Sequence, residues 1–430
     1  MPKDMTQTPA IFERRESEAR SYCRSMPSTF ATARGSELFD DSGNRWIDFL
    51  AGCSSLNYGH NDPDMKAALI DHIAADGIAH GLDFHTTAKA DFLEAFESYI
   101  LSPRGMDHRV MFTGPTGANA VEAAMKIARK VTGRTNIIAF TNGFHGVTAG
   151  ALAATGNGYH RGGAGMALNG VTRMPFDGYF GDAADSADFL KAMLSDKSGG
   201  VDAPAAILLE TVQGEGGLNV ASPAWVQRIA KLARDHGALL IIDDIQAGCG
   251  RCGTFFSFEE MGVTPDIVTM AKSVSGFGLP MAMVLVRPDH DVFGPAEHNG
   301  TFRGNTHAFV TARVAIEKFW ADGTFQAELG RKAELIRAGL TELADMVPGA
   351  RLKGRGLMQG VDVGSGELAG AICSRAFENG LVIETSGNED QVVKVLAPLT
   401  TPKATFAKGF DILLAAARDV LAAPTKIAAE

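Results

Sequence analysis

The chain has 430 residues, of which 45% are hydrophobic and 21% are charged, and its formal net charge at pH 7 is -10. This length predicts a large core divided between two domains. An acidic balance without long runs of Lys or Arg argues against nucleic acid and against an anionic membrane surface as partners. No apolar run is long enough to span a membrane and no signal peptide is visible, so we expect a cytoplasmic protein.

The N-terminal part of the chain contains no clear catalytic signal. Its periodicity predicts helices over 11–25, 64–75 and 88–101, and a hairpin with a Gly- and Ser-rich loop over 37–59. The loop can line a pocket or be an ordinary connection, and the sequence leaves both open. His80, Asp83 and His85 lie close together, but no helical His-x-x-x-His pair or fitting carboxylate set accompanies them, so a metal site is unsupported.

A strand, a glycine turn and a helix follow one another in the next segment. The apolar spacing predicts the strand over 109–114 and the helix over 118–131. The helix would begin with unpaired backbone N–H groups and the positive end of its dipole, which together suit a phosphate. Gly117 lets the backbone approach such a ligand, and the Thr116 hydroxyl can donate to it. No Gly-Lys-Ser/Thr follows, so this is not a P-loop, and a Gly-rich turn alone is a weak signal.

Two ring-bearing residues follow the next predicted strand. The strand covers 136–140, and Phe144 and His145 come just after it. A flat ring at this position can stack on a cofactor, although simple packing is the commoner role of a lone aromatic residue. The Gly-rich segment 159–181 is predicted to be irregular, and 182–196 is predicted to be a helix.

Three short apolar segments that end in polar residues are predicted to be strands of one parallel sheet. They cover 203–212, 238–242 and 266–270, and a helix over 223–236 supplies the crossover between the first two. Glu215, Asp243 and Lys272 come after the three strands in turn. Ligands of open α/β sheets bind beyond the carboxyl ends of the strands, so these side chains would face one pocket.

An acid and a lysine at one sheet edge have two explanations. Pyridoxal phosphate needs such a pair, because a lysine holds its aldehyde as a Schiff base and an acid keeps its pyridine nitrogen protonated. A structural ion pair between Asp243 and Lys272 is the alternative. The Cys249 and Cys252 pair is a CxxC, but no second CxxC supports a zinc ribbon and no thioredoxin-like context supports a redox role. We therefore expect no metal.

The last part of the chain has a different pattern of predicted helices and strands. Helices are predicted over 308–320 and 325–346, and from 351 onward short strands alternate with helices, the last of them over 403–423. This pattern predicts a second, smaller domain. We divide the chain into an N-terminal segment that packs with the small domain (1–60), a large domain with the pocket (61–309) and the small C-terminal domain (310–430).

Six motifs resemble, in order, those of class III aminotransferases: GPTGANAVEAAMKIAR, FHG, ETVQGEGG, LLIIDDIQAGCGR, the lysine in MAKSVSG, and GTFRGN. The likeness extends over nearly the whole chain. It implies an α/β fold, the fold type I scaffold of pyridoxal phosphate enzymes, with a mostly parallel central sheet in the large domain and a smaller α/β C-terminal domain. Within the family, DFLAGCSSLNYGHN and GIAHGLDFHTTAK look most like the branch that forms diaminobutyrate in ectoine biosynthesis.

The resemblance implies roles for residues at the pocket. Lys272 would hold pyridoxal phosphate and move a proton between the substrate carbon and the cofactor, and Asp243 would pair with the pyridine nitrogen. Gln246 would hydrogen-bond the ring hydroxyl. Phe144 would stack on the ring, with His145 beside it.

The resemblance also implies how the phosphate is held. The backbone at Gly117 and Ala118, helped by Thr116, would bind it, and Thr301 would reach it from the other subunit. The active site would then be shared between two chains. The implied assembly is a homodimer at least, and a tetramer stays open.

Two positions depart from the family pattern where the substrate is recognised. Val147 stands where many relatives have an arginine that is available to a substrate carboxylate. Lys394 stands where relatives often have an arginine that binds the 2-oxoglutarate carboxylate and pairs with the glutamate at Glu215. A lysine keeps the charge but loses the two-pronged geometry, so carboxylate recognition by Glu215 and Lys394 must differ in detail.

The implied reaction is a transamination in two half-reactions. L-glutamate would leave as 2-oxoglutarate, and L-aspartate β-semialdehyde would receive the amino group at its terminal carbon and become L-2,4-diaminobutyrate. The alternatives are a class III enzyme for ornithine, acetylornithine or 4-aminobutyrate, a racemase or aminomutase, and a non-enzymatic binding protein. An isomerase would need no second keto substrate, and the intact Lys272 and Asp243 pair argues against a non-enzyme.

Overall fold

The structure is a computed structural model that describes residues 9–422. Within that range its largest sheet has seven strands, and they are, from one edge to the other, β4 (Arg109–Phe112), β12 (Met283–Val286), β11 (Ile267–Met270), β10 (Leu239–Asp243), β7 (Pro204–Leu209), β5 (Asn136–Phe140) and β6 (Val171–Met174). Neighbouring strands pair in parallel except at β12, which is antiparallel to β4 and β11. The predicted mostly parallel central sheet is therefore confirmed.

Helices cover both faces of this sheet, which is why its strands read as continuous apolar runs. Successive residues of β10 point to opposite faces. Leu239 and Ile241 join the core that contains the buried face of α6 (Gly117–Thr132). Leu240 and Ile242 join the larger core, which includes the buried residues of α10 (Pro223–Asp235).

The ends of α6 and α10 follow from local capping signals. The Thr116 hydroxyl accepts from the backbone N–H of Asn119 at the start of α6, and Gly133, with φ of 67°, ends the helix in the left-handed conformation. Ser222 caps α10, and Pro223 occupies its first position, where no backbone N–H is needed. Both helices were predicted to within one residue at each end.

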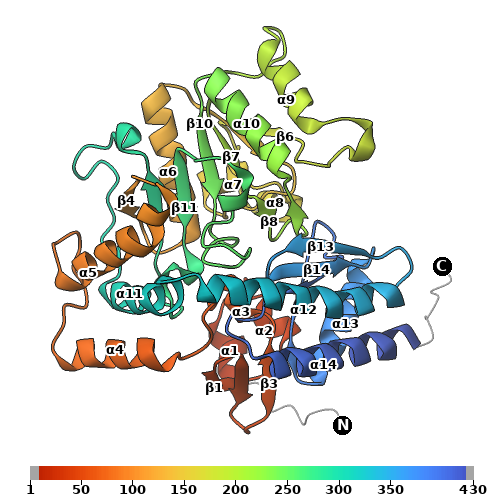
Figure 1. Ribbon diagram of the computed structural model, residues 1–430. Coiled ribbons are helices and arrows are strands. Elements are labelled where there is room, and N and C mark those ends of the chain that lie inside the picture. The colour runs from red at the N-terminus through yellow and green to blue at the C-terminus, as the bar shows by residue number, and fades with distance from the viewer. Residues whose placement is uncertain (1–8, 423–430) are drawn as a thin grey trace.

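A second sheet pairs strands from the N-terminal part of the chain with a strand from its C-terminal part. It contains β1 (Phe30–Arg34), β2 (Glu37–Asp40) and β3 (Arg45–Asp48), and β15 (Leu381–Val382) adds to β3 in parallel. Trp46 is fully buried here, stacks on Phe377 at 5.5 Å and donates from Nε1 to the Phe377 carbonyl at 2.9 Å. In Figure 1 the red N-terminal strands accordingly lie beside the blue C-terminal elements.

A third sheet consists of β13 (Arg351–Arg355), β14 (Met358–Asp362), β17 (Val392–Val395) and β16 (Glu384–Ser386), all antiparallel. The helices in this part of the chain are α12 (Thr324–Met346), α13 (Gly366–Glu378) and α14 (Lys403–Ala422). We propose that the chain divides at residues 60 and 309. The outermost parts of that division, 1–8 and 423–430, lie outside the described residues, as does the predicted end of the last helix at Ala423.

The remaining elements include two corrections. The remaining α-helices are α1 (Ala10–Arg15), α2 (Tyr22–Ser25), α3 (Ala51–Ser54), α4 (Pro63–Ala74), α5 (Thr87–Phe96), α7 (Ala149–Ala154), α8 (Gly158–Gly162), α9 (Ser186–Ser195) and α11 (Thr306–Trp320), and β8 (Val212–Gln213) pairs with β9 (Asn219–Val220). The single helix predicted over 11–25 is instead two short helices. The segment 159–181 is not irregular throughout, because β6 lies within it as a half-buried edge strand. No helix among residues 9–422 is both long and apolar enough to cross a membrane.

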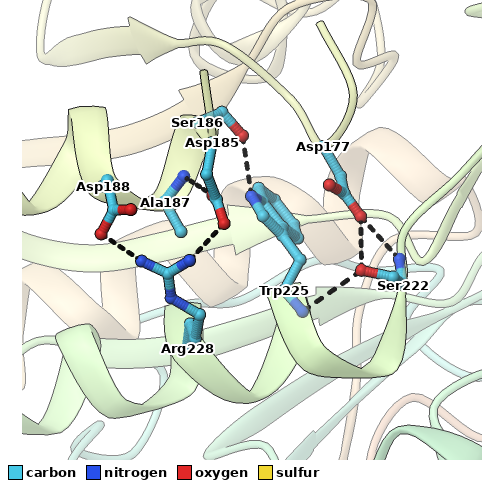
Figure 2. A network of polar contacts seen from close by, with 8 residues as sticks. All are labelled: Asp177, Asp185, Ser186, Ala187, Asp188, Ser222, Trp225 and Arg228. Carbon is cyan, nitrogen blue, oxygen red and sulfur yellow. Dashed lines mark hydrogen bonds and ion pairs between the residues drawn. The ribbon is translucent and has the colours of Figure 1, made fainter. Parts of the chain in front are cut away.

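Figure 2 shows how α9 is fixed to α10. Trp225 Nε1 donates to Ser186 Oγ at 2.8 Å, and both residues are buried, with 2% exposure. Arg228 forms ion pairs with Asp185 and Asp188 on the surface beside them. Leaving a buried donor without its acceptor costs more free energy than losing an exposed ion pair.

We expect Ser186→Ala to lower the free energy of unfolding by about 1–3 kcal/mol, because it leaves the buried Trp225 N–H without its acceptor. Asp188→Asn is the matched control on the same helix. It should cost at most about 1 kcal/mol, because Asp188 is exposed. Urea unfolding of both variants at one protein concentration measures the difference, and equal losses would show that the buried bond is not the more important contact.

Candidate active site

A cavity of about 470 Å³ lies where β10 and β11 end. Asp243 is the last residue of β10, Lys272 comes two residues after β11, and both line the cavity. Because parallel strands end at the same edge of a sheet, their meeting is a direct result of the topology. The lining also includes seven residues that the sequence placed near a ligand: Thr116, Gly117, Ala118, Phe144, His145, Glu215 and Gln246.

The N-terminus of α6 forms one wall of the cavity. Thr116 is the N-cap, and Gly117 and Ala118 are the first two residues of the helix. The first N–H groups of a helix have no partner within it and carry the positive end of its dipole, so this wall is suited to an anion. A Cβ atom at Gly117 would lie 3.0 Å from Ile245 Cδ1, so a side chain here would displace the neighbouring wall.

Asp243 is held by three contacts in a buried position. Its Oδ1 accepts from Thr269 Oγ1 at 3.0 Å and from the Ile245 backbone N–H at 3.2 Å. Its Oδ2 lies 2.7 Å from His145 Nδ1. Burial lowers the pKa of His145, but the hydrogen bond and charge of Asp243 and the charge of Glu210 raise it by more, so the net shift is upward. With a proton on Nδ1, the His145 ring donates to Asp243 and fixes the carboxylate at the cavity.

Glu210 adjoins this pair and was not predicted as a site residue. Burial raises its pKa to about 7, with the His145 charge opposing the shift and the Asp243 charge adding to it. Its Oε2 accepts from the Phe144 backbone N–H at 3.0 Å. That bond fixes the backbone of Phe144, whose side chain lines the same cavity.

Lys272 begins a short 3-10 turn (Lys272–Ser275) with φ of 53°. A left-handed conformation costs a non-glycine residue about 1–3 kcal/mol and is concentrated at functional sites. The turn is held by the N-terminal loop: Ser273 Oγ donates to the Ser54 carbonyl at 2.6 Å and accepts from the Asn57 backbone N–H at 2.9 Å. The Gly- and Ser-rich loop therefore supports the turn that carries Lys272.

A cluster of opposite charges adjoins the cavity. Lys394 is fully buried, and its Nζ lies 3.0 Å from Glu215 Oε1 and 2.9 Å from Glu384 Oε1. Gln246 Nε2 also donates to Glu215 Oε1, at 2.9 Å. Burial raises the pKa of Glu215, but the charges of Lys394 and Lys272 outweigh it, and the pKa falls to about 2. Glu215 is therefore a carboxylate at neutral pH.

Two members of this cluster were missed from the sequence, Glu384 and Tyr22. Glu384 Oε2 accepts from the Tyr22 hydroxyl at 3.3 Å, and that hydroxyl lies 2.7 Å from Cys53 Sγ. The sequence feature that could have indicated Glu384 is a single acidic residue directly after the apolar residues Leu381 to Ile383. Tyr22 is far from Glu384 in the sequence, and its short helix gives no local indication of this contact.

Several other candidates lie apart from the cavity lining. Thr301 and Val147 are exposed. Cys249 and Cys252 are buried, and burial raises the pKa of Cys252 to about 11, so the structure gives the CxxC no reactive thiolate. His80 packs edge-on against Phe302 at 5.2 Å. Among residues 9–422 no group of three His, Cys, Asp or Glu side chains could hold a metal ion.

A lysine, a buried acid and a helix N-terminus in one cavity of this α/β fold define a pyridoxal-phosphate-dependent enzyme of fold type I. These groups fit the aldehyde, the pyridine nitrogen and the phosphate of that cofactor. The chain belongs to the class III aminotransferases, because the pattern of that family, described as Aminotransferase class-III, matches residues 20–417.

Known proteins with similar sequences or structures are also aminotransferases. It is 54% identical over 405 residues to a diaminobutyrate–2-oxoglutarate transaminase of Vibrio cholerae, covering 94% of this chain and 98% of the relative. It is 54% identical over 408 residues to the enzyme of that name from Halomonas elongata, covering 94% and 97%. The solved ornithine aminotransferase of Toxoplasma gondii is 27% identical, with a TM-score of 0.84 and coverage of 96% and 94%.

Asp244, next to Asp243, gives a test of the buried electrostatics. It is 1% exposed, both of its carboxylate oxygens lie 3.2 Å from the Ser257 backbone N, and burial raises its pKa from 3.8 to about 7 against the effect of Ser257. The folded chain therefore binds a proton here more tightly than the unfolded chain. The resulting stabilisation is full below the unfolded pKa and is lost as the pH rises through about 7.

We expect Asp244→Asn to flatten the decline of stability with rising pH. Between about pH 5 and about pH 8 the wild type should lose roughly 2–4 kcal/mol more than the variant, because only the wild type must ionise a buried carboxyl group. Urea unfolding at the two pH values measures this difference. Glu210 titrates in both proteins, so it cancels in the comparison, and parallel pH slopes would contradict the raised pKa of Asp244.

Proposed function

We propose that the chain transfers the amino group of L-glutamate to the terminal aldehyde of L-aspartate β-semialdehyde, giving L-2,4-diaminobutyrate and 2-oxoglutarate. Relatives that are 54% identical over most of both chains carry the name of this activity. The observation that carries the proposal is the cluster of Glu215, Glu384 and Lys394 next to the cofactor groups. Such a cluster suits a substrate with both a carboxylate and an ammonium group remote from the reacting carbon. We also propose that the reaction takes place in the cytoplasm and begins ectoine formation.

The chain's own residues supply proton transfer and orientation. Pyridoxal phosphate, when bound, supplies an aldehyde that combines with amines and a ring that accepts electrons from the reacting carbon. The Lys272 amine would hold the aldehyde and, after exchange with the substrate amine, take the α-proton of glutamate. Asp243 would keep the pyridine nitrogen protonated while His145 orients Asp243. In the second half-reaction Lys272 would return a proton to the carbon that gains the amino group.

The other proposed cofactor contacts come from the cavity lining. Phe144 would stack on the ring, and Gln246 would hydrogen-bond the ring hydroxyl. The α6 N-terminus, at Gly117 and Ala118 with Thr116 before them, would hold the phosphate. The unpaired N–H groups of that helix support this assignment, because they require a partner.

We further propose a homodimer in which Thr301 reaches the phosphate site of the other subunit. Thr301 is exposed in its own chain, and its neighbour Phe302 is 66% exposed. Phe84 and Leu82 are exposed as well, at 64% and 47%. The His80 ring contact joins the loop that carries them to Phe302. Several large apolar side chains exposed near one another are typical of an interface between subunits.

A parallel assay tests the substrate. Diaminobutyrate, ornithine and 4-aminobutyrate are each offered with 2-oxoglutarate, and kcat/KM for diaminobutyrate should exceed the others by at least about tenfold. Lys272→Ala should be inactive with all three and should lose the visible absorbance of lysine-bound cofactor. Equal rates on the three donors would defeat the narrow assignment. Turnover without 2-oxoglutarate would favour the racemase or aminomutase alternative.

Co-expression of two defective variants tests the shared site. Lys272→Ala lacks the lysine, and Thr301→Asp places a negative charge where the phosphate would bind. If Thr301 acts across the interface, each mixed dimer has one intact site, and random pairing restores about a quarter of the wild-type activity. If Thr301 acts within its own chain, or not at all on the phosphate, the mixture shows no more activity than the two variants give separately.

A further inference from the structure

Glu384 belongs to the charged cluster, but the proposed function gives it no role of its own. It lies in β16 and is paired in register with Lys394 of β17, so the two side chains project from the same face of the sheet. Glu384 is 9% exposed, and its Oε1 lies 2.9 Å from the Lys394 ammonium. The distance is that of an ion pair, but the alignment is not that of a hydrogen bond, and this buried oxygen accepts none from the described residues.

The charges of the cluster do not balance. With both carboxyl groups ionised, Glu215 and Glu384 contribute two negative charges and Lys394 contributes one positive charge, so one negative charge remains. Burial raises the pKa of Glu384 and the charge of Lys394 opposes the rise, so the surplus charge is present when Glu384 has lost its proton. The Tyr22 and Cys53 groups near Glu384 do not change the count, because burial raises the pKa of both, that of Cys53 to about 11. An uncompensated buried charge is costly, so a buried carboxyl group either takes up a proton or pairs with a cation.

Lys272 is the other cation that acts on both carboxylates. Burial raises the pKa of both carboxyl groups, and the charges of Lys394 and Lys272 oppose it, so that the pKa of Glu215 falls to about 2 while the net shift of the Glu384 pKa is upward. In the proposed function Lys272 is committed to the cofactor. When Glu384 is ionised, a cationic group of the substrate is then the partner that the surplus charge would attract.

The carboxylate that a substrate would meet is Glu215. Its side chain is 33% exposed and it lines the cavity, whereas Lys394 is fully enclosed. Because the Lys394 ammonium is shared with Glu384, it does not fully neutralise Glu215. Removal of the Glu384 charge would leave Glu215 and Lys394 as a balanced pair with little attraction for a further cation.

We propose that Glu384 is a specificity-determining residue: as the second counter-ion of Lys394, it leaves on Glu215 the negative charge that binds the α-ammonium group of diaminobutyrate. The inference rests on the proposed function and deepens it. 4-Aminobutyrate is diaminobutyrate without the α-ammonium group and has the same chain length. Comparison of the two donors therefore isolates this contact.

The test uses the holoenzyme with Glu384→Gln, and Glu384→Asp as the matched variant that keeps the charge. We expect Glu384→Gln to lower kcat/KM for diaminobutyrate by about 10- to 100-fold, mainly through KM, and to change that for 4-aminobutyrate by less than about threefold. The KM for 2-oxoglutarate, a dianion, should stay the same or fall, because repulsion by the cluster is reduced. Glu384→Asp should retain most of the preference for diaminobutyrate.

Three results would overturn the inference. Equal losses with both donors would make Glu384 a structural support for Lys394. An unchanged preference in Glu384→Gln would show that its charge is not used, and loss of the preference in Glu384→Asp would show that charge is not the property that matters. If the Gln variant does not fold, Glu384→Met, of similar volume and without charge, repeats the test. A wild type without any preference for diaminobutyrate would instead defeat the proposed function itself.

Discussion

The parallel pairing of β10 with β11 is the constraint on which the site depends. Both strands are buried on both faces, so a charged side chain within them would need a partner inside the core. The polar exception is Thr269, which lies opposite Asp243 in the register and donates to it. Charged groups are therefore admitted only where the two strands end, and there the cavity opens. The acid and the lysine meet because two apolar runs stop at the same edge.

Segments distant in the sequence close this edge. Arg251 is fully buried and donates to Asn57 Oδ1 at 2.6 Å and to the Ala397 carbonyl at 2.7 Å, so it ties the N-terminal loop to the C-terminal region. Burial lowers the Arg251 pKa to about 9, and neutral oxygen acceptors compensate for part of the desolvation. This arginine stands between Cys249 and Cys252. The CxxC spacing thus belongs to a tight loop that buries an arginine, and burial raises the pKa of both thiols.

The features predicted correctly from the sequence are those with local causes. Strand β5 and helix α6 are specified by an apolar run or by caps at their own ends. Strand β6 was missed because Thr172 and Arg173 interrupt any apolar run, and its extended state depends on pairing with β5. Glu384 was missed for a similar reason, because its ion-pair partner, Lys394, lies on the neighbouring strand. The role proposed for Thr301 depends on a second chain, which no pattern within one chain specifies.

The surroundings of Lys394 explain what a lysine does at this position. An arginine, which the family resemblance implies at this position, would engage one carboxylate with two parallel bonds from its planar fork. Lys394 is a compact charge, and the structure divides it between Glu215 and Glu384 at nearly equal distances. Burial lowers its pKa, but the two carboxylates raise it by more, so it stays charged. A divided charge neutralises neither carboxylate fully. A lysine at this position therefore gives a site of mixed charge, which is the property that the proposed diaminobutyrate activity requires.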